Sequence, residues 1–215
     1  AAPASVTADG ATTSSITVAL ADANGNLLTA SGGTVALSST GSATIGAVTD
    51  NGNGTYTATV TNTVAESVTI SGTLDGAAIT DTAAITFIDA KAPKLLSSTP
   101  SDNASNVELD QNIILNFSEN VIAGSGNIEL FEENGLLVES FTVSSSIISG
   151  STVTLNPTND LNYNFAYYIQ IPATAIKDTA GNTYAGITNN TALNFITRQK
   201  TAKEGFAEVQ DEIST

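Results

Sequence analysis

Carboxylate and amide side chains provide the chemistry available to this sequence. Two loops share the pattern Asp-x-x-Gly-Asn, one beginning at Asp22 and the other at Asp178. Oxygen-rich loops of this kind can hold a divalent cation, and the same pattern also forms a tight turn closed by its own aspartate. An EF-hand is excluded at Asp22, because glycine comes fourth instead of sixth and the twelfth residue is Gly33 instead of glutamate. The tight turn is the simpler interpretation of both loops.

The sequence lacks the residues that several common catalytic and metal sites require. The 215 residues include no histidine and no cysteine, which provide most general bases, nucleophilic triads and zinc ligands. We therefore expect a protein that is not an enzyme. The net charge of −15 disfavours nucleic acid and anionic membranes as partners. No apolar run reaches the length of a membrane span, so we expect no membrane insertion.

The segments that flank these loops are predicted to be β-strands. Residues 55–60 and 67–74 alternate apolar and polar side chains most clearly, and Asp75-Gly76 predicts a hairpin into a strand over residues 77–87. Strands that recur every eight to twelve residues are typical of a β-sandwich. The predicted fold class is all-β.

A short segment around Pro93 divides the chain. Proline has no N–H to donate and favours an extended Ala92, so the segment predicts a stiff joint. We predict one β-sandwich over residues 1–90, a second over residues 91–198, and a helical or disordered tail over residues 199–215. The tail has four apolar residues at helical spacing: Ala202, Phe206, Val209 and Ile213.

The second domain has its own strand pattern and an aromatic cluster. Its predicted strands cover residues 94–97, 112–117, 127–131, 136–143, 152–155, 166–171 and 192–196. A single helical turn is predicted over residues 172–176. Alternation places Tyr163, Phe165 and Tyr167 in the core and leaves Tyr168 alone on the outer face. One exposed tyrosine is a poor platform for a sugar ring, so we interpret the cluster as core.

The first domain resembles a known family. Residues 8–18, 22–26 and 51–60 are similar to the immunoglobulin-like (Ig-like) repeats of bacterial invasin and intimin adhesins, and the resemblance covers about residues 3–88. It implies an Ig-like β-sandwich in an extracellular or cell-surface protein, without indicating a receptor.

The second domain resembles a different bacterial Ig-like module. The segments that carry the resemblance are residues 100–103, 114–121, 168–171 and 176–182, within a match over about residues 92–198. This module recurs in S-layer proteins and giant repetitive surface proteins. The resemblance implies a structural or adhesive module whose partners are neighbouring Ig-like domains of the same polypeptide or identical copies.

Strand direction predicts that acidic residues from separate segments of both domains meet at the joint near Ala90. The last strand of the first domain arrives at the joint with Asp89, and the second strand of the second domain returns there before Glu119. The strand ending at Ile171 runs the same way and leads to Asp178 and Asn182.

Such a cluster predicts a calcium site. Oxygen ligands without histidine or cysteine suit Ca²⁺, so we predict Asp89, Glu119, Asp178 and Asn182 as ligands. Glu66 or Asp9 would assist, because their loops belong to the same end of the first domain. The alternative is a solvated acidic joint, partly paired with its three nearby lysines: Lys91, Lys94 and Lys177.

The expected function is that of a structural and adhesive segment of a large bacterial cell-surface protein. It would extend or space another part of that protein, with calcium stiffening the joint. One alternative is a subunit of an S-layer or secreted fibre, which a donated terminal strand would favour. The other is an accessory module of an extracellular polysaccharide-degrading enzyme, which an exposed aromatic row would favour.

Overall fold

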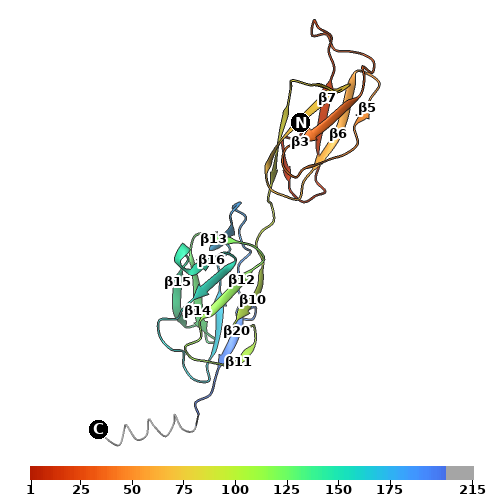
Figure 1. Cartoon of the computed structure of the whole chain (residues 1–215). Helices are drawn as coiled ribbons and strands as arrows, with labels where there is room; N and C mark the ends of the chain where they lie inside the picture. Colours follow the sequence, from red (N-terminus) through yellow and green to blue (C-terminus); the bar gives the residue numbers. More distant parts are fainter. Residues whose placement is uncertain (202–215) are drawn as a thin grey trace, which may run out of the picture. The chain divides into compact units, whose positions relative to one another are not determined.

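The computed structural model describes residues 1–201 and consists almost entirely of β-strands (Figure 1). The predicted all-β fold class is therefore confirmed. The chain divides into two compact units, Ala1–Ala90 and Lys91–Thr215. The predicted tail over residues 199–215 lies almost entirely outside the described residues. Within the described part, no helix is long and apolar enough to cross a membrane.

One sheet of the first unit has the strand order β1-β9-β7-β3, with β8 added to β7. These strands are β1 (Ser5–Thr7), β3 (Val35–Ser39), β7 (Ser67–Leu74), β8 (Ala77–Ala78) and β9 (Ala83–Ile88). β1 runs parallel to β9, and the other pairs are antiparallel. Alternation along β7 buries Val68 and Ile70 on the inner face.

The opposing sheet has the order β2-β6-β4, with β5 also paired to β6. Its strands are β2 (Ser14–Ala19), β4 (Thr44–Ile45), β5 (Thr49–Asp50) and β6 (Thr55–Thr61). β2 is an edge strand of this sheet. Its inner face contributes Ile16, which is buried, and Val18, which is only partly buried.

The predicted strand over residues 77–87 is wrong in one respect, because it is two strands. Leu74 pairs with Ala77 and Ile70 pairs with Ala83, so four residues along β7 correspond to six along the returning chain. The excess residues cannot continue the ladder, and residues 79–82 leave the sheet.

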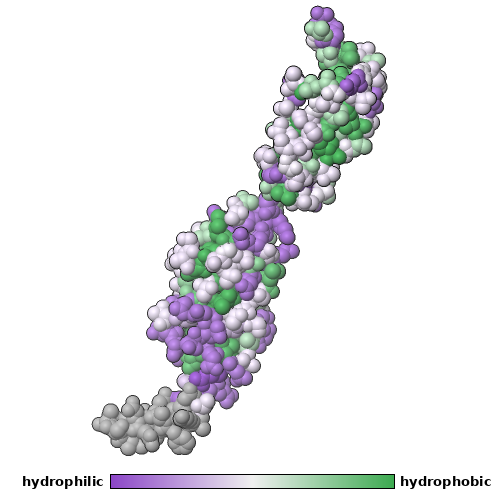
Figure 2. All heavy atoms as spheres, viewed as in Figure 1, coloured by the Kyte–Doolittle hydropathy of each residue, from purple (hydrophilic) through white to green (hydrophobic). Residues whose placement is uncertain are grey.

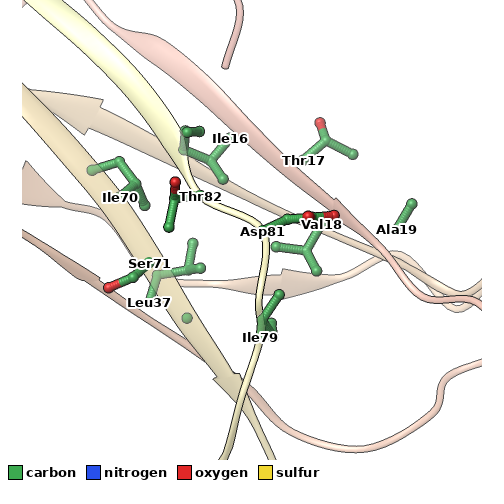
Figure 3. A pocket seen from close by; sticks show the side chains of 12 residues that line it. Ile16, Thr17, Val18, Ala19, Leu37, Ile70, Ser71, Ile79, Asp81 and Thr82 are labelled. Atoms are coloured by element: carbon green, nitrogen blue, oxygen red, sulfur yellow. The ribbon is translucent and has the colours of Figure 1, made fainter.

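A pocket lies where residues 79–82 leave the sheet (Figure 3). Ile16 and Val18 of β2 line one wall, and residues of the opposing sheet and of the departing segment line the other. The apolar residues of that second wall are Leu37, Ile70, Ile79 and Ala83. The sandwich is therefore open along this side of β2.

The second unit is also built from two main sheets, with orders β10-β12-β17-β16 and β11-β20-β18-β14-β15. The first contains β10 (Leu95–Thr99), β12 (Ile113–Phe117), β16 (Ile148–Ser149) and β17 (Thr152–Leu155). The second contains β11 (Ala104–Val107), β14 (Asn127–Glu132), β15 (Leu137–Thr142), β18 (Ala166–Gln170) and β20 (Asn194–Thr197). β11 runs parallel to β20, as β1 does to β9.

A small third sheet corrects the prediction for residues 172–176. The predicted helical turn is wrong: a turn leads into β19 (Ile176–Asp178), which pairs with β13 (Val121–Ala123). Ile176 is fully buried and lies opposite Ala123, so a tertiary contact determines the local conformation. The described residues contain a single 3₁₀ turn, Ser145–Ile147.

The aromatic cluster is arranged partly as predicted. Tyr167 is buried, but Phe165 is 41% exposed, because Asn164 adopts a left-handed conformation (φ 56°) just before the strand and interrupts the alternation. Tyr168 was predicted to be exposed and is only 8% exposed. Its ring stacks on that of Phe131, with centroids 5.2 Å apart and planes 11° apart. The cross-strand neighbour, placed by the pairing of β14 with β18, thus covers it.

The two units differ in surface character. On the face seen in Figure 2, strongly hydrophilic residues gather on the second unit, whereas the first unit is mostly of intermediate hydropathy with apolar patches. The first ninety residues contain no lysine or arginine and many serines and threonines.

Candidate functional site

The loop that follows β19 holds a buried carboxylate. Asp178 is 1% exposed and accepts hydrogen bonds from the backbone N–H of Asn182 at 2.8 Å and from its side-chain amide at 2.7 Å. Burial of a charge is costly unless hydrogen bonds replace the lost water. Asn182 therefore makes the burial of Asp178 possible.

The same contacts determine the charge state of Asp178. Burial raises the pKa of this carboxyl, but hydrogen bonds from the Asn182 side chain and from backbone N–H groups of the loop lower it further, so its pKa lies below the ordinary value. Asp178 is consequently ionised at neutral pH. The loop's own hydrogen bonds hold its oxygen atoms in position.

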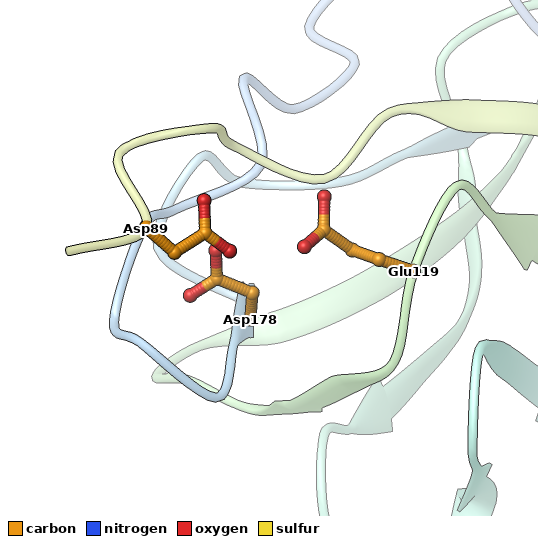
Figure 4. A group of neighbouring side chains, drawn as sticks. All are labelled: Asp89, Glu119 and Asp178. Atoms are coloured by element: carbon orange, nitrogen blue, oxygen red, sulfur yellow. The ribbon is translucent and has the colours of Figure 1, made fainter. Parts of the chain in front are cut away.

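Two further carboxylates lie beside Asp178 (Figure 4). Asp89 comes from the segment after β9, and Glu119 follows β12. One oxygen atom of each carboxylate lies within 4.8 Å of one oxygen atom of each of the others, and both Asp89 and Glu119 are partly buried. Within residues 1–201, these three form the only such group of three.

Three predicted ligands therefore come together, and the fourth, Asn182, binds Asp178 through both its backbone and its side chain. The chemistry of the group is that of hard oxygen donors carrying negative charge. Ca²⁺ takes six to eight oxygen ligands, so waters or backbone carbonyls would have to complete a shell around these carboxylates.

Asp9 and Glu66, predicted as assisting residues, lie outside this group of three; Asp9 closes a local turn, and Glu66 joins its own loop to the loop that contains Ser42. Asp9 accepts hydrogen bonds from the N–H groups of Ala11 and Thr12, and the side chain and N–H of Thr12 contribute most to lowering its pKa to about 2. Glu66 accepts from the N–H of Ser42 at 2.7 Å and the amide of Asn62 at 2.8 Å.

The loop at Asp22 has the same internal hydrogen bonds as the loop at Asp178. Asp22 accepts from the N–H and the side-chain amide of Asn26, both at 2.9 Å. Unlike Asp178, it is exposed, and it belongs to no group of three carboxylates within the described residues. The turn interpretation thus holds for both loops. What distinguishes the second loop is its neighbours.

Comparisons with known proteins agree with this architecture. The family model described as bacterial Ig-like domain matches residues 89–197, a range that begins at Asp89 and includes all three carboxylates. The model described as invasin, domain 3, matches residues 1–90. A search of curated proteins gave no match.

The solved structure of one bacterial adhesin resembles the chain in fold, and two further adhesins match it with lower TM-scores. The adhesin InvE of Yersinia pseudotuberculosis is 21% identical with a TM-score of 0.52, and the match covers 91% of this chain and 57% of InvE. The Escherichia coli adhesin FdeC is 18% identical (TM-score 0.42; 93% of this chain and 62% of that one). Invasin, a bacterial integrin-binding protein, is 21% identical (TM-score 0.45; 79% of this chain and 35% of that one). This chain therefore spans little more than half of the InvE structure.

The matches confirm the two resemblances predicted from the sequence motifs. The bacterial Ig-like model covers just over half of the chain, and the invasin domain 3 model covers the part before it. The chain belongs to the bacterial Ig-like domain family.

Proposed function

We propose that this chain is a structural segment of a large bacterial cell-surface adhesin and that it extends the adhesive part of that protein away from the envelope. The observation that carries the proposal is the succession of two Ig-like family matches over residues 1–197, each on a unit with its own core. The function requires folded units joined in series and no reactive group.

The two alternatives make different demands on the surface. An accessory module for polysaccharides needs an open row of aromatic rings, whereas the Phe131–Tyr168 stack leaves Tyr168 only 8% exposed. This contact favours the extender over the polysaccharide module. A subunit of an S-layer or fibre would bind copies of itself.

Surface display tests the extender. One copy or two copies of the chain are placed between a cell-surface anchor and a fluorescent epitope, and the height of the epitope above the envelope is measured. The second copy should increase this height by about as much as the first. Equal heights would contradict the proposal. Purified chain should also sediment as a monomer over a wide range of concentration, because growth into large assemblies would favour the fibre.

The proposal includes calcium at Asp89, Glu119 and Asp178, with Asn182 holding Asp178. In it, the ion fixes the segment that contains Asp89 to the loops after β12 and β19. Two unit charges 4 Å apart repel by roughly 1 kcal/mol in water and roughly 4 kcal/mol at an effective dielectric constant of 20. A divalent cation offsets this repulsion for all three carboxylates, and a concentration of about a hundred times Kd adds roughly 2.7 kcal/mol to the stability of the state that binds.

A matched pair of variants tests calcium binding. Asp178→Asn and Asp22→Asn make the same chemical change in loops with the same hydrogen bonds, but only Asp178 has carboxylate neighbours. Calcium should raise the melting temperature of the wild type and of Asp22→Asn, and the increase should be lost in Asp178→Asn. Magnesium should replace calcium poorly, because it keeps its waters and requires a tighter octahedron. Identical melting curves in calcium and in chelator would refute the site and leave the extender untouched.

A further inference from the structure

One edge of the first unit is paired at only one position. Within the described residues, β2 pairs with β6 on one side, and on the other side it makes a single bridge from Ser15 to Ala2. Ser15 donates to and accepts from Ala2, with both N···O distances at 2.9 Å. The N–H and C=O groups of Ser15 therefore face away from β6.

Alternation extends this orientation along the strand. The backbone N–H and C=O groups of successive residues in a strand point to opposite sides. Thr17 and Ala19, two and four residues after Ser15, therefore face the same side as Ser15, whereas Leu20 donates to Gly54 on the β6 side. Both residues thus direct an N–H and a C=O toward the open edge, where no described backbone group pairs with them. Both are exposed. An unpaired row of this kind is a template for another strand.

An apolar groove lies directly under this edge (Figure 3). Ile16 is 4% exposed, but Val18, two residues further along the same inner face, is only partly buried. Leu37 and Ile79, both partly buried, line the opposite wall of the groove. The inward side chains of an added strand would cover them.

The second unit shows how such an edge is covered. In each unit, a strand that follows a proline pairs in parallel with the last strand: β1 with β9 after Pro3, and β11 with β20 after Pro100. Before Pro100, β10 pairs with β12 from Leu95 to Thr99. Before Pro3, only Ala2 occupies the corresponding place on β2.

We infer that the open edge of β2 accepts an antiparallel strand formed by polypeptide joined directly to Ala1. Antiparallel pairing continued from Ala2 and Ser15 places the residue before Ala1 opposite Thr17, and the second residue before Ala1 opposite Val18. Residues opposite one another share a face, so the second residue points into the groove and should be apolar. The inference rests on the proposed function in one respect, since it requires a polypeptide in which residues precede Ala1.

Two N-terminal extensions of equal length test the inference on the full chain. Thr-Val-Thr-Val-Thr, joined to Ala1, places both valines over the groove, and Val-Thr-Val-Thr-Val places its valines on the outer face. The first should slow hydrogen exchange of the Thr17 and Ala19 amides at least about tenfold and raise the melting temperature of the first unit. The second should do so much less, because a shift of one residue reverses the faces. A third extension, Thr-Val-Pro-Val-Thr, has no N–H to donate to the C=O of Ala19, so the added strand loses one hydrogen bond and should protect the Thr17 and Ala19 amides less than the first extension does.

Unchanged exchange in all three extended chains, or equal protection by the first two, would overturn the inference. Protection that appears only as the chain dimerises, detected by sedimentation of the same samples, would also overturn it, because the strand would then come from a second copy. The display experiment is independent of these measurements, so failure of the strand and failure of the extender can be told apart.

Discussion

The two units form the same kind of sandwich but bury their apolar cores to different degrees. The second unit has one continuous cluster of buried apolar residues that includes Leu115 and Val153, neither of them exposed. The first unit has two smaller clusters, with Val18 and Leu37 at the margins of both. The difference coincides with the edge strand, since β10 covers β12 whereas β2 is bridged only by Ala2. In these two units, the larger continuous core occurs where the edge strand is present.

The units also use their carboxylates differently. In the first unit, Asp9 and Asp22 accept hydrogen bonds within their own turns, and Glu66 accepts them from Ser42 of another loop and from Asn62; these contacts lower the pKa of each. Asp178, in the second unit, closes its turn in the same way and also has two carboxylate neighbours. A turn-closing aspartate becomes a candidate ligand only when tertiary structure brings further oxygens to it.

The largest expected effect compares identical deletions in the two cores. Val153→Ala removes two methyl groups from a sealed site and should cost the second unit roughly 2–3 kcal/mol, because a cavity adds to the lost burial. Val18→Ala removes the same groups from the open side of the first unit and should cost roughly 0.8 kcal/mol. Hydrogen exchange of the slowest amides of each unit measures the two losses separately. Equal losses would mean that the open edge does not weaken the first core.

A second comparison concerns two glycines with positive φ. Gly54 has φ +81°, and a Cβ there would clash with the carbonyl oxygen of Leu28. Gly135 has φ +90°, with no atom within 4 Å of the same position. Gly54→Ala should therefore destabilise the first unit by about 1–3 kcal/mol, and Gly135→Ala should cost the second unit about 1 kcal/mol, from backbone strain alone. Thermal unfolding of both variants checks the order, and a larger loss for Gly135→Ala would contradict the steric explanation.

The smallest expected effect is the acid sensitivity of a turn. The folded-state pKa of Asp9, about 2, lies below its ordinary value of 3.8, so its contribution to stability is fully present above the ordinary value and is lost as the pH falls toward 2. Asp9→Asn keeps an acceptor oxygen but does not titrate. The melting temperature of the first unit should fall less steeply between about pH 4 and pH 2 in this variant. Parallel curves for variant and wild type would show that the turn does not contribute.

Strong alternation made the long strands predictable. Residues 67–74 were predicted with the bounds that the structure has, and residues 55–60 within one residue of them. The short strands β11, β13, β16 and β19 were missed, because their two to four residues do not alternate clearly between apolar and polar side chains, unlike residues 152–155, which were predicted. Distant pairing partners specify them instead. The exposed state predicted for Tyr168 was wrong for a similar reason, since Phe131, which covers it, comes from another strand.

The carboxylate group was accessible to sequence reasoning through strand direction alone. Two antiparallel returns bring Glu119 and Asp178 to the end at which Asp89 enters, and no local pattern is needed. The same reasoning could not separate them from Asp9 and Glu66, because the hydrogen bonds that hold those two depend on the loop conformation. The open edge of β2 was not predicted, since it depends on which strand lies beside it.

The parallel pairing of first and last strands has a mechanical consequence. In the first unit, hydrogen bonds from Thr86 to Ala4 and from Ala8 to Ile88 lie at the two ends of the β1–β9 pair. Because the two strands are parallel, the start of β1 and the end of β9 lie at opposite ends of the pair. A pull on both ends of the unit therefore slides β1 along β9 and strains all of their hydrogen bonds at once, instead of peeling them apart one by one. The β11–β20 pair is parallel in the same way, but β10 precedes β11, so a pull on the second unit also loads the antiparallel pair of β10 with β12.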